Sequence, residues 1–180
     1  YKHRNDEEAK RFIERLLAYL SPAAGSSILD LACGKGRHAR MMAEYPLQVT
    51  GMDLSPASIE EAKVYEKDNL HFLTGDMRED FGEAVYDYVF NLFTSFGYFE
   101  DEADNLAVLR RANKALKPKG LLVIDFLNSY RAARNLVAKE NLNRDGFRFE
   151  IKRFLRDKHI VKNISFMDGE RFMEFEERVQ

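Results

Sequence analysis

The sequence predicts an α/β protein: a doubly wound parallel β-sheet with helices on both faces, followed by an antiparallel β meander. Short apolar runs alternate with amphipathic helical stretches as far as residue 126, which is typical of βαβ crossovers. Runs such as ILDL and LLVIDF are almost continuously apolar, as in strands buried on both faces. After residue 139, apolar and charged residues alternate with the period of a half-exposed strand.

The elements of the parallel part follow in order along the chain. A first helix is predicted from a cap at Asn5 or Asp6 to Ser21-Pro22, with its apolar residues on one face. Strands are predicted at residues 27–31, 47–52, 70–74, 85–91 and 121–126. Further helices are predicted at 37–45, from Ser55-Pro56 to residue 67, and from Asp101 or Asp104 to a break at Lys117-Pro118-Lys119-Gly120.

The last part of the chain is predicted to be a β extension. Residues 147–179 alternate like a meander with one solvent-exposed face, with turns at Asp157-Lys158 and Asp168-Gly169. We expect one domain, in which residues 140–180 extend a core of residues 1–139. The pattern stops in mid-strand and the chain has no initiator Met, so we expect a polypeptide truncated at its C-terminus, with no sheet strand beyond the fifth.

Composition narrows the classes of partner. The 180 residues are 45% hydrophobic, which is enough for a core without a metal or disulfide. A single cysteine, Cys33, predicts a reducing, cytoplasmic setting, and no apolar run reaches the roughly 20 residues of a membrane span. A net charge of -2 gives no overall bias toward nucleic acid. Residues 131–163 hold ten basic and four acidic groups, which favours a solvated sheet face over contact with RNA or an anionic substrate.

A glycine turn after the first strand is the candidate binding loop. Ligands of open parallel sheets bind beyond the carboxyl ends of the strands. There, Gly34 and Gly36 allow a sharp turn and close approach of a ligand, and Asp53 ends the second strand with a carboxylate suited to two ribose hydroxyls. This predicts a nucleoside-containing cofactor. The turn also matches the dinucleotide pattern G-x-G-x-x-G/A, but Asp30 disfavours a pyrophosphate and suits an ammonium instead.

Five segments carry a family resemblance: ILDLACGKGRHA (28–39), VTGMDLS (49–55), LHFLTGDMRE (70–79), YDYVFNLFTSFGYF (86–99) and LKPKGLLVIDFLN (116–128). In this order they resemble class I S-adenosylmethionine-dependent methyltransferases, and NLFTSFGYF is similar to a bacterial branch that acts on small molecules. The resemblance implies a Rossmann-like sheet of strand order 3-2-1-4-5. It also implies a cytoplasmic enzyme that transfers a methyl group from S-adenosylmethionine to a small-molecule acceptor, leaving S-adenosylhomocysteine.

The resemblance also implies roles for particular residues. The methionine and ribose parts of the cofactor would lie on the glycine turn, the adenine beside the ends of the second and third strands, and the acceptor beside the aromatic run after the fourth. Arg4 is expected to pair with the methionine carboxylate, and the Asn91 and Leu92 backbone with its ammonium. The implied cofactor residues are Asp30, Ala32, Gly34, Gly36, Asp53, Leu54, Asp76, Met77, Asn91, Leu92 and Arg4; the acceptor-pocket residues are Phe93, Ser95, Phe96 and Tyr98.

Other readings stay open. No residue stands out as a general base, no Cys/His cluster has metal-ligand spacing, and Cys33 and His38 read as packed residues rather than catalytic ones. Asn-Leu-Phe-Thr replaces the Asn/Asp-Pro-Pro-Tyr/Phe of many amino-group methylators, which disfavours methylation of a base or amide nitrogen. A cofactor-binding module without its own activity would bind the cofactor but transfer no methyl group, and an NAD-linked oxidoreductase would bind a nicotinamide cofactor. The sequence predicts neither the acceptor nor the oligomeric state.

Overall fold

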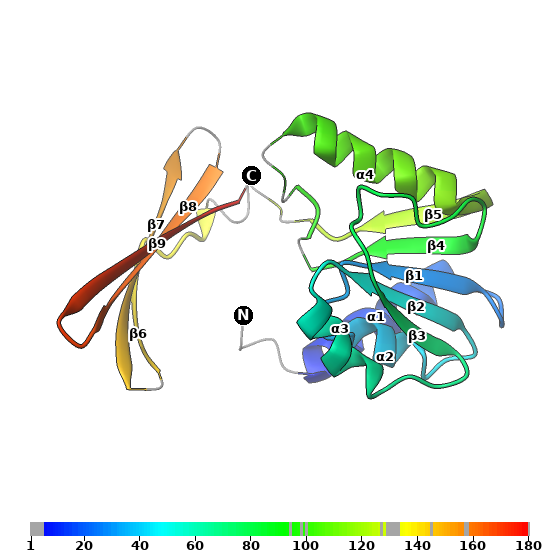
Figure 1. Ribbon diagram of the computed structural model, residues 1–180, viewed down its shortest axis with the longest axis horizontal. Helices are drawn as coiled ribbons and strands as arrows, with labels where there is room; N and C mark the ends of the chain where they lie inside the picture. The colour runs from blue at the N-terminus through cyan, green and yellow to red at the C-terminus, as the bar shows by residue number, and fades with distance from the viewer. Residues whose placement is uncertain are drawn as a thin grey trace. The chain divides into compact units, whose positions relative to one another are not determined.

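The structure is a computed structural model that describes residues 6–93, 95–97, 99, 101–126, 128, 134–144, 146–156 and 159–179. Contacts divide the chain into two compact units, Tyr1–Phe126 and Leu127–Gln180 (Figure 1). The expected grouping of residues 1–139 and 140–180 into one domain stays a prediction. Of the described helices, none combines the length and the apolar character needed to cross a bilayer.

The first unit contains a five-stranded parallel sheet of order β3-β2-β1-β4-β5, which confirms the predicted strand order. The order reverses between β1 and β4, so the loops that follow these two strands meet at the carboxyl edge of the sheet. Each strand lies within a few residues of its predicted position. The bounds are Ser27–Leu31 (β1), Gln48–Asp53 (β2), Leu70–Thr74 (β3), Tyr86–Asn91 (β4) and Leu116–Ile124 (β5).

Helices cover both faces of this sheet, as predicted (Figure 1). Successive side chains of a strand point to opposite faces. Ile28 therefore packs in a core with the first three helices, while its neighbour Leu29 packs in a second core with the fourth. The helices are Asp6–Leu20 (α1), Arg37–Met42 (α2), Pro56–Lys63 (α3) and Glu102–Ala115 (α4).

Capping side chains set where the helices begin. Ser55 Oγ accepts the Ser58 backbone N–H at 3.3 Å, ahead of a proline in the first turn of α3. Asp101, rather than Asp104, caps α4 by accepting the Ala103 N–H at 2.8 Å. The predicted ends were too late, because α2 stops at Met42 and α3 at Lys63. Asn5, the other candidate cap of α1, lies outside the described residues.

The helix stops before residues 117–120, as predicted, but these residues are not a loop: β5 already begins at Leu116 rather than at residue 121. A register irregularity absorbs the extra residues: Tyr86 pairs with Leu116, but Tyr88 pairs with Leu121. Proline fits here because β5 is an edge strand among the described residues, so a missing N–H need not interrupt a ladder. The described part of residues 147–179 adds no strand to this edge, because its strands pair within a separate sheet.

The second unit is an antiparallel sheet of order β6-β7-β8-β9, which confirms the predicted meander and adds one strand. The additional strand is Lys139–Arg144 (β6), followed by Phe147–Arg156 (β7), His159–Asp168 (β8) and Arg171–Val179 (β9). Aromatic residues gather on one face, where the Phe166 ring centroid lies 4.8 Å from that of Phe149 and 6.2 Å from that of Phe175.

Many cations of the basic stretch pair with acids inside this second sheet. Lys139 lies 2.7 Å from Glu150, Arg153 lies 2.8 Å from Glu140, and Arg156 lies 2.8 Å from Glu176. The first two pairs join the adjacent strands β6 and β7, and the third reaches from β7 to β9 across β8; ion pairs of this kind are typical of a solvated sheet face. They support that interpretation of residues 131–163 over the alternative of an anion-binding surface.

Candidate functional site

The glycine turn after β1 bends through three residues with positive φ: Ala32 at 62°, Gly34 at 56° and Gly36 at 73°. Gly36 favours the absence of a side chain, because an added Cβ would clash with the Phe72 ring and the φ is positive. A Cβ added at Gly34 would have no neighbouring atom within 4 Å. The turn is therefore packed tightly behind Gly36 and stays open in front of Gly34, where a ligand can approach the backbone.

Asp53 connects the end of β2 to this turn. Its Oδ2 accepts the Gly34 N–H at 2.7 Å and its Oδ1 accepts the Ser55 N–H at 2.9 Å. Because each carboxylate oxygen has two lone pairs, both oxygens retain capacity for a further donor. The next residue, Leu54, is 63% exposed, which is unusual for a leucine beside a buried strand. The structure thus brings the predicted ribose residue against the predicted glycine turn.

Asp30 is a buried carboxylate with an unsatisfied oxygen. It lies next to the end of β1 with 1% of its surface exposed, and its Oδ2 has no hydrogen-bond partner among the described residues. Burial raises the pKa of Asp30 to about 7, a hydrogen bond with the Ala39 backbone opposes this, and the nearby Asp53 charge adds to it. A buried acceptor without a donor is costly, so this oxygen suits a cationic or N–H-bearing ligand.

Asn91 is the last residue of β4, the strand beside β1. Its Nδ2 donates to the Leu31 carbonyl at 3.1 Å, whereas its Oδ1 is buried without a partner among the described residues. The Asn91 carbonyl already accepts the Asp125 N–H at 3.0 Å, and the Leu92 carbonyl accepts the Ser95 hydroxyl at 3.3 Å. Either carbonyl can accept one more donor, because a carbonyl oxygen has two lone pairs.

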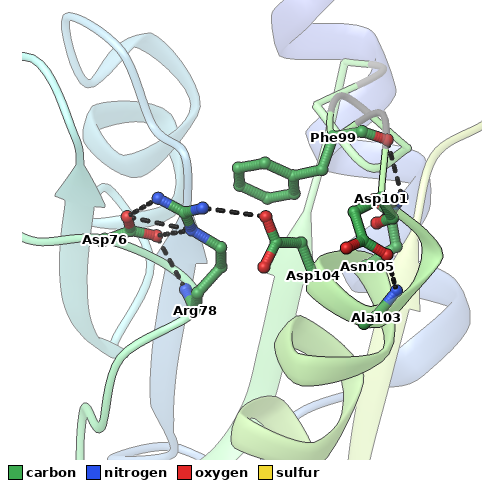
Figure 2. Close-up of polar contacts among 7 residues, drawn as sticks. All are labelled: Asp76, Arg78, Phe99, Asp101, Ala103, Asp104 and Asn105. Atoms are coloured by element: carbon green, nitrogen blue, oxygen red, sulfur yellow. Dashed lines mark hydrogen bonds and ion pairs between the residues drawn. The ribbon is translucent and has the colours of Figure 1, made fainter.

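The loop after β3 places Asp76 in an ion pair that the sequence did not predict. Arg78 Nη2 lies 2.6 Å from Asp76 Oδ2, and Arg78 Nη1 lies 2.9 Å from Asp104 in α4 (Figure 2). The hydrogen bonds from Arg78 hold the pKa of Asp76 below its ordinary value. Met77 packs in the second core, with its Sδ 4.0 Å from Asn91 Nδ2. The two expected adenine residues therefore face different partners.

A cavity of about 220 Å³ lies beside the turn, within the first unit. Its aromatic wall includes Phe93, whose φ of 66° is strained for a residue with a side chain. Phe93 donates its N–H to Asp125 Oδ2 at 3.3 Å, and the Arg37 guanidinium lies 5.2 Å from its ring centroid. The lining residues are Glu8, Ala9, Phe12, Arg37, His38, Phe93 and Asp125.

The structure does not bring all the predicted acceptor residues to the cavity. Phe93 lines the cavity, whereas Ser95 is not among its lining residues and Phe96 packs against the second core, 6.4 Å from Phe126 between ring centroids. Tyr98 and the expected methionine partner Arg4 lie outside the described residues. Sequence reasoning missed Asp125 and Arg78, because nothing in their local patterns separates them from ordinary surface charges.

Cys33 and His38 both pack against apolar neighbours. Burial, followed by the charges of Asp30 and Asp53, raises the pKa of the Cys33 thiol, so it stays protonated and is a poor nucleophile. His38 is 9% exposed, and its ring centroid lies 6.3 Å from that of Phe12 and 5.8 Å from that of Phe93. His38 is thus enclosed by aromatic rings at one wall of the cavity.

Comparison with known proteins identifies relatives of this chain. The methyltransferase domain family matches residues 28–120. YqeM of Bacillus subtilis (strain 168), named as a methyltransferase, is 36% identical over 109 residues, 59% of this chain and 44% of that protein. A ubiquinone biosynthesis O-methyltransferase of Xanthomonas axonopodis pv. citri (strain 306) is 32% identical over 128 residues, 67% of this chain and 51% of that protein. This chain spans about half the length of these curated relatives.

Solved structures agree on the fold. A S-adenosylmethionine-dependent methyltransferase from Clostridium acetobutylicum ATCC 824 aligns with a TM-score of 0.72 at 20% identity. The alignment covers 97% of this chain and 73% of that chain, so it includes strands of both sheets. At this identity the likeness concerns the fold alone.

Proposed function

Because the chain belongs to the methyltransferase domain family, we propose that it transfers a methyl group from S-adenosylmethionine to a small-molecule acceptor. One observation carries the cofactor assignment. Asp30 Oδ2 is a buried acceptor without a donor among the described residues, and it lies just before a glycine turn whose Gly34 N–H is bound by Asp53. A ligand with an ammonium group and a ribose satisfies both carboxylates, whereas a pyrophosphate would bring negative charge toward Asp30.

The residues at the carboxyl edge fit this cofactor. Asp30 and the Ala32–Gly36 turn would bind the methionine end, with Gly34 allowing contact with the backbone. The remaining lone pairs of Asp53 would accept the ribose hydroxyls, and the exposed side chain of Leu54 would cover the adenine. Asp76 and Met77 would border the adenine, and the Asn91 and Leu92 carbonyls the ammonium. The carboxylate role of Arg4 stays part of this proposal.

The bound cofactor supplies an electrophilic methyl group on a sulfonium ion, so the protein's task is largely orientation and exclusion of water. The turn and Asp53 hold the donor in place, and the walls of the neighbouring cavity hold the acceptor. Asp125 lines this cavity and accepts the Phe93 N–H at the start of the aromatic run. It is positioned to accept a hydrogen bond from an acceptor hydroxyl or amine.

The cavity supports a small acceptor. About 220 Å³ accommodates a single ring or a short chain, and the lining mixes two phenylalanine rings with charged side chains. The Xanthomonas relative is named as a ubiquinone biosynthesis O-methyltransferase. We extend only the small-molecule class to this chain, together with the cytoplasmic location expected from its single cysteine.

Isothermal titration calorimetry with S-adenosylhomocysteine tests the cofactor assignment. We expect micromolar binding by the wild-type chain and none of NAD at the same concentration. Absence of S-adenosylhomocysteine binding would overturn the proposal, and binding of NAD instead would favour the oxidoreductase alternative. Methyl transfer from labelled S-adenosylmethionine to a panel of small acceptors then separates an enzyme from a cofactor-binding module.

A further inference from the structure

Arg78 makes an unusually complete set of contacts with one carboxylate. Its backbone N–H donates to Asp76 Oδ1 at 2.9 Å, its Nε lies 3.0 Å from Oδ1 and 3.1 Å from Oδ2, and its Nη2 lies 2.6 Å from Oδ2. Three N–H groups of one residue therefore point at Asp76. A carboxylate offers about four lone-pair positions, so Asp76 retains about one for any other donor.

The other side of the guanidinium is held by the start of α4 (Figure 2). Arg78 Nη1 donates to Asp104 Oδ2 at 2.9 Å, and the guanidinium carbon lies 4.6 Å from the Phe99 ring centroid. Asn105 Nδ2 in turn donates to the Phe99 carbonyl at 2.9 Å. The guanidinium is thus fixed from both sides, and it fixes Asp76.

Only arginine combines these contacts. Its planar fork binds both oxygens of one carboxylate while a further N–H reaches a second acid, which the point charge of lysine does not reproduce. Asp76 is the inner partner, with 15% of its side chain exposed against 40% for Asp104. The arrangement is therefore suited to holding Asp76 in a single orientation rather than to binding a mobile surface ion.

We propose that Arg78 is a positioning residue that orients Asp76 so that its one remaining lone pair accepts the exocyclic amino group of adenine. This inference rests on the proposed cofactor. A fixed carboxylate with one free position accepts one N–H in one direction, whereas a mobile one must be ordered on binding and discriminates less. Arg78 thereby sets the preference for adenine over a base that has a carbonyl oxygen in place of the amino group.

The test compares two ligands by calorimetry: S-adenosylhomocysteine, and S-inosylhomocysteine, in which a carbonyl replaces the amino group. The wild type should prefer the adenine ligand by about 10- to 100-fold, as expected for one hydrogen bond to a charged group. In Arg78→Gln this preference should fall to about threefold or less, and Arg78→Lys should lie between.

Lys117→Gln is the matched control. It removes the ion pair between Lys117 and Asp87, 2.9 Å apart, where β4 and β5 begin rather than where the candidate site lies. Its ligand preference should equal that of the wild type. If Arg78→Gln does not fold, Asp104→Ala replaces it: this variant removes only the outer partner of Arg78 and should lower the preference by a smaller factor.

The outcomes separate the inference from the proposed function. If both ligands weaken equally in Arg78→Gln, so that their ratio is unchanged, Arg78 has only a structural role and the inference is overturned. A ratio that rises overturns it as well. If the wild type binds neither ligand, the proposed function itself fails, and the inference fails with it.

Discussion

Gly34 donates its backbone N–H to Asp53 Oδ2 across 2.7 Å, so one hydrogen bond joins the turn after β1 to the end of β2. The two residues are 19 positions apart in the sequence, and only the parallel pairing of β1 with β2 brings them together. The bond gives the Asp53 carboxylate a fixed orientation at the open side of the turn. The same carboxylate therefore supports the turn and remains available to a ligand.

The substitution Asp53→Ala should weaken S-adenosylhomocysteine binding by at least about tenfold, since it removes an acceptor for the ribose and loosens the turn. Asp87→Ala is the matched control: Asp87 Oδ2 accepts the Ser27 backbone N–H at 2.8 Å, but near the opposite, amino ends of the strands. Both variants lose a carboxylate bonded to a backbone N–H, so both should lose stability. Calorimetry should show weaker binding only for Asp53→Ala, and equal weakening in both would contradict the assignment.

The Asp30 carboxyl predicts a pH-dependent stability. Its pKa is about 7 in the folded chain against an ordinary 3.8, so the unfolded chain loses this proton at lower pH. The contribution of Asp30 is fully favourable below about pH 4 and declines as the pH rises to about 7. Asp30→Asn should therefore stabilise the ligand-free protein by roughly 2–4 kcal/mol at about pH 8, and by much less at about pH 4.

Urea unfolding of the wild type and of Asp30→Asn at these two pH values measures this difference. A stability difference that does not change with pH would refute the link to the Asp30 carboxyl. The same variant should bind S-adenosylhomocysteine more weakly at neutral pH, because the amide lacks the charge that pairs with the ammonium group.

The two glycines of the turn should respond differently to alanine. In Gly36→Ala the new Cβ clashes with the Phe72 ring and the residue keeps a φ of 73°, so the free energy of unfolding should fall by about 2–4 kcal/mol. Gly34→Ala should lower the free energy of unfolding by only about 1–2 kcal/mol, the cost of a positive φ in a residue with a side chain. It also places a methyl group where the ligand approaches. Thermal unfolding and calorimetry should thus show the larger stability loss at Gly36 and the larger binding loss, relative to stability, at Gly34.

A second substitution makes the Gly36 result specific. Phe72→Leu removes the ring atoms that the new Cβ would meet, so it should recover part of the stability lost in Gly36→Ala. Losses that simply add in the double variant would show that the Phe72 ring is not the cause.

Asp125→Asn tests the assignment of the cavity to the acceptor. The amide oxygen can still accept the Phe93 N–H, so the fold should persist while the charge is lost. We expect S-adenosylhomocysteine affinity to stay within about threefold of the wild type and kcat/KM for the acceptor to fall at least about tenfold. Asp87→Asn is the control, because Asp87 also accepts a backbone N–H, that of Ser27, but near the amino ends of the strands. A loss of cofactor affinity in Asp125→Asn would instead assign the cavity to the cofactor.

Much of the fold could be predicted because local patterns and the core demand the same structure. The apolar runs that form β1 and β4 need burial on both faces, and helices packed on each side supply it. The strand β6 could not be predicted in this way. Its sequence, KENLNR, has one apolar residue and low strand propensity, so pairing with β7 decides its conformation.

The start of β5 also could not be predicted from local sequence. Lys117-Pro118-Lys119-Gly120 has the composition of a break, yet the chain continues along β4 through a register shift. Proline is excluded from a strand only where its missing N–H would leave a partner unsatisfied. Whether such a partner exists depends on which strand lies at the edge of the sheet, and this is a property of the assembled sheet.

In the candidate site, too, some features follow from the local sequence and others from the tertiary structure. The sequence by itself determined which residues end the strands and where the chain must turn, because glycine, proline and capping side chains act on their own neighbours. Only the tertiary structure decided that Asp30 is buried with an oxygen that no described residue satisfies, that Arg78 occupies most of Asp76, and that Asp125 meets Phe93 at a cavity wall. Burial, charge pairing and cavities depend on segments far apart in the chain, and no local pattern records which of them will meet.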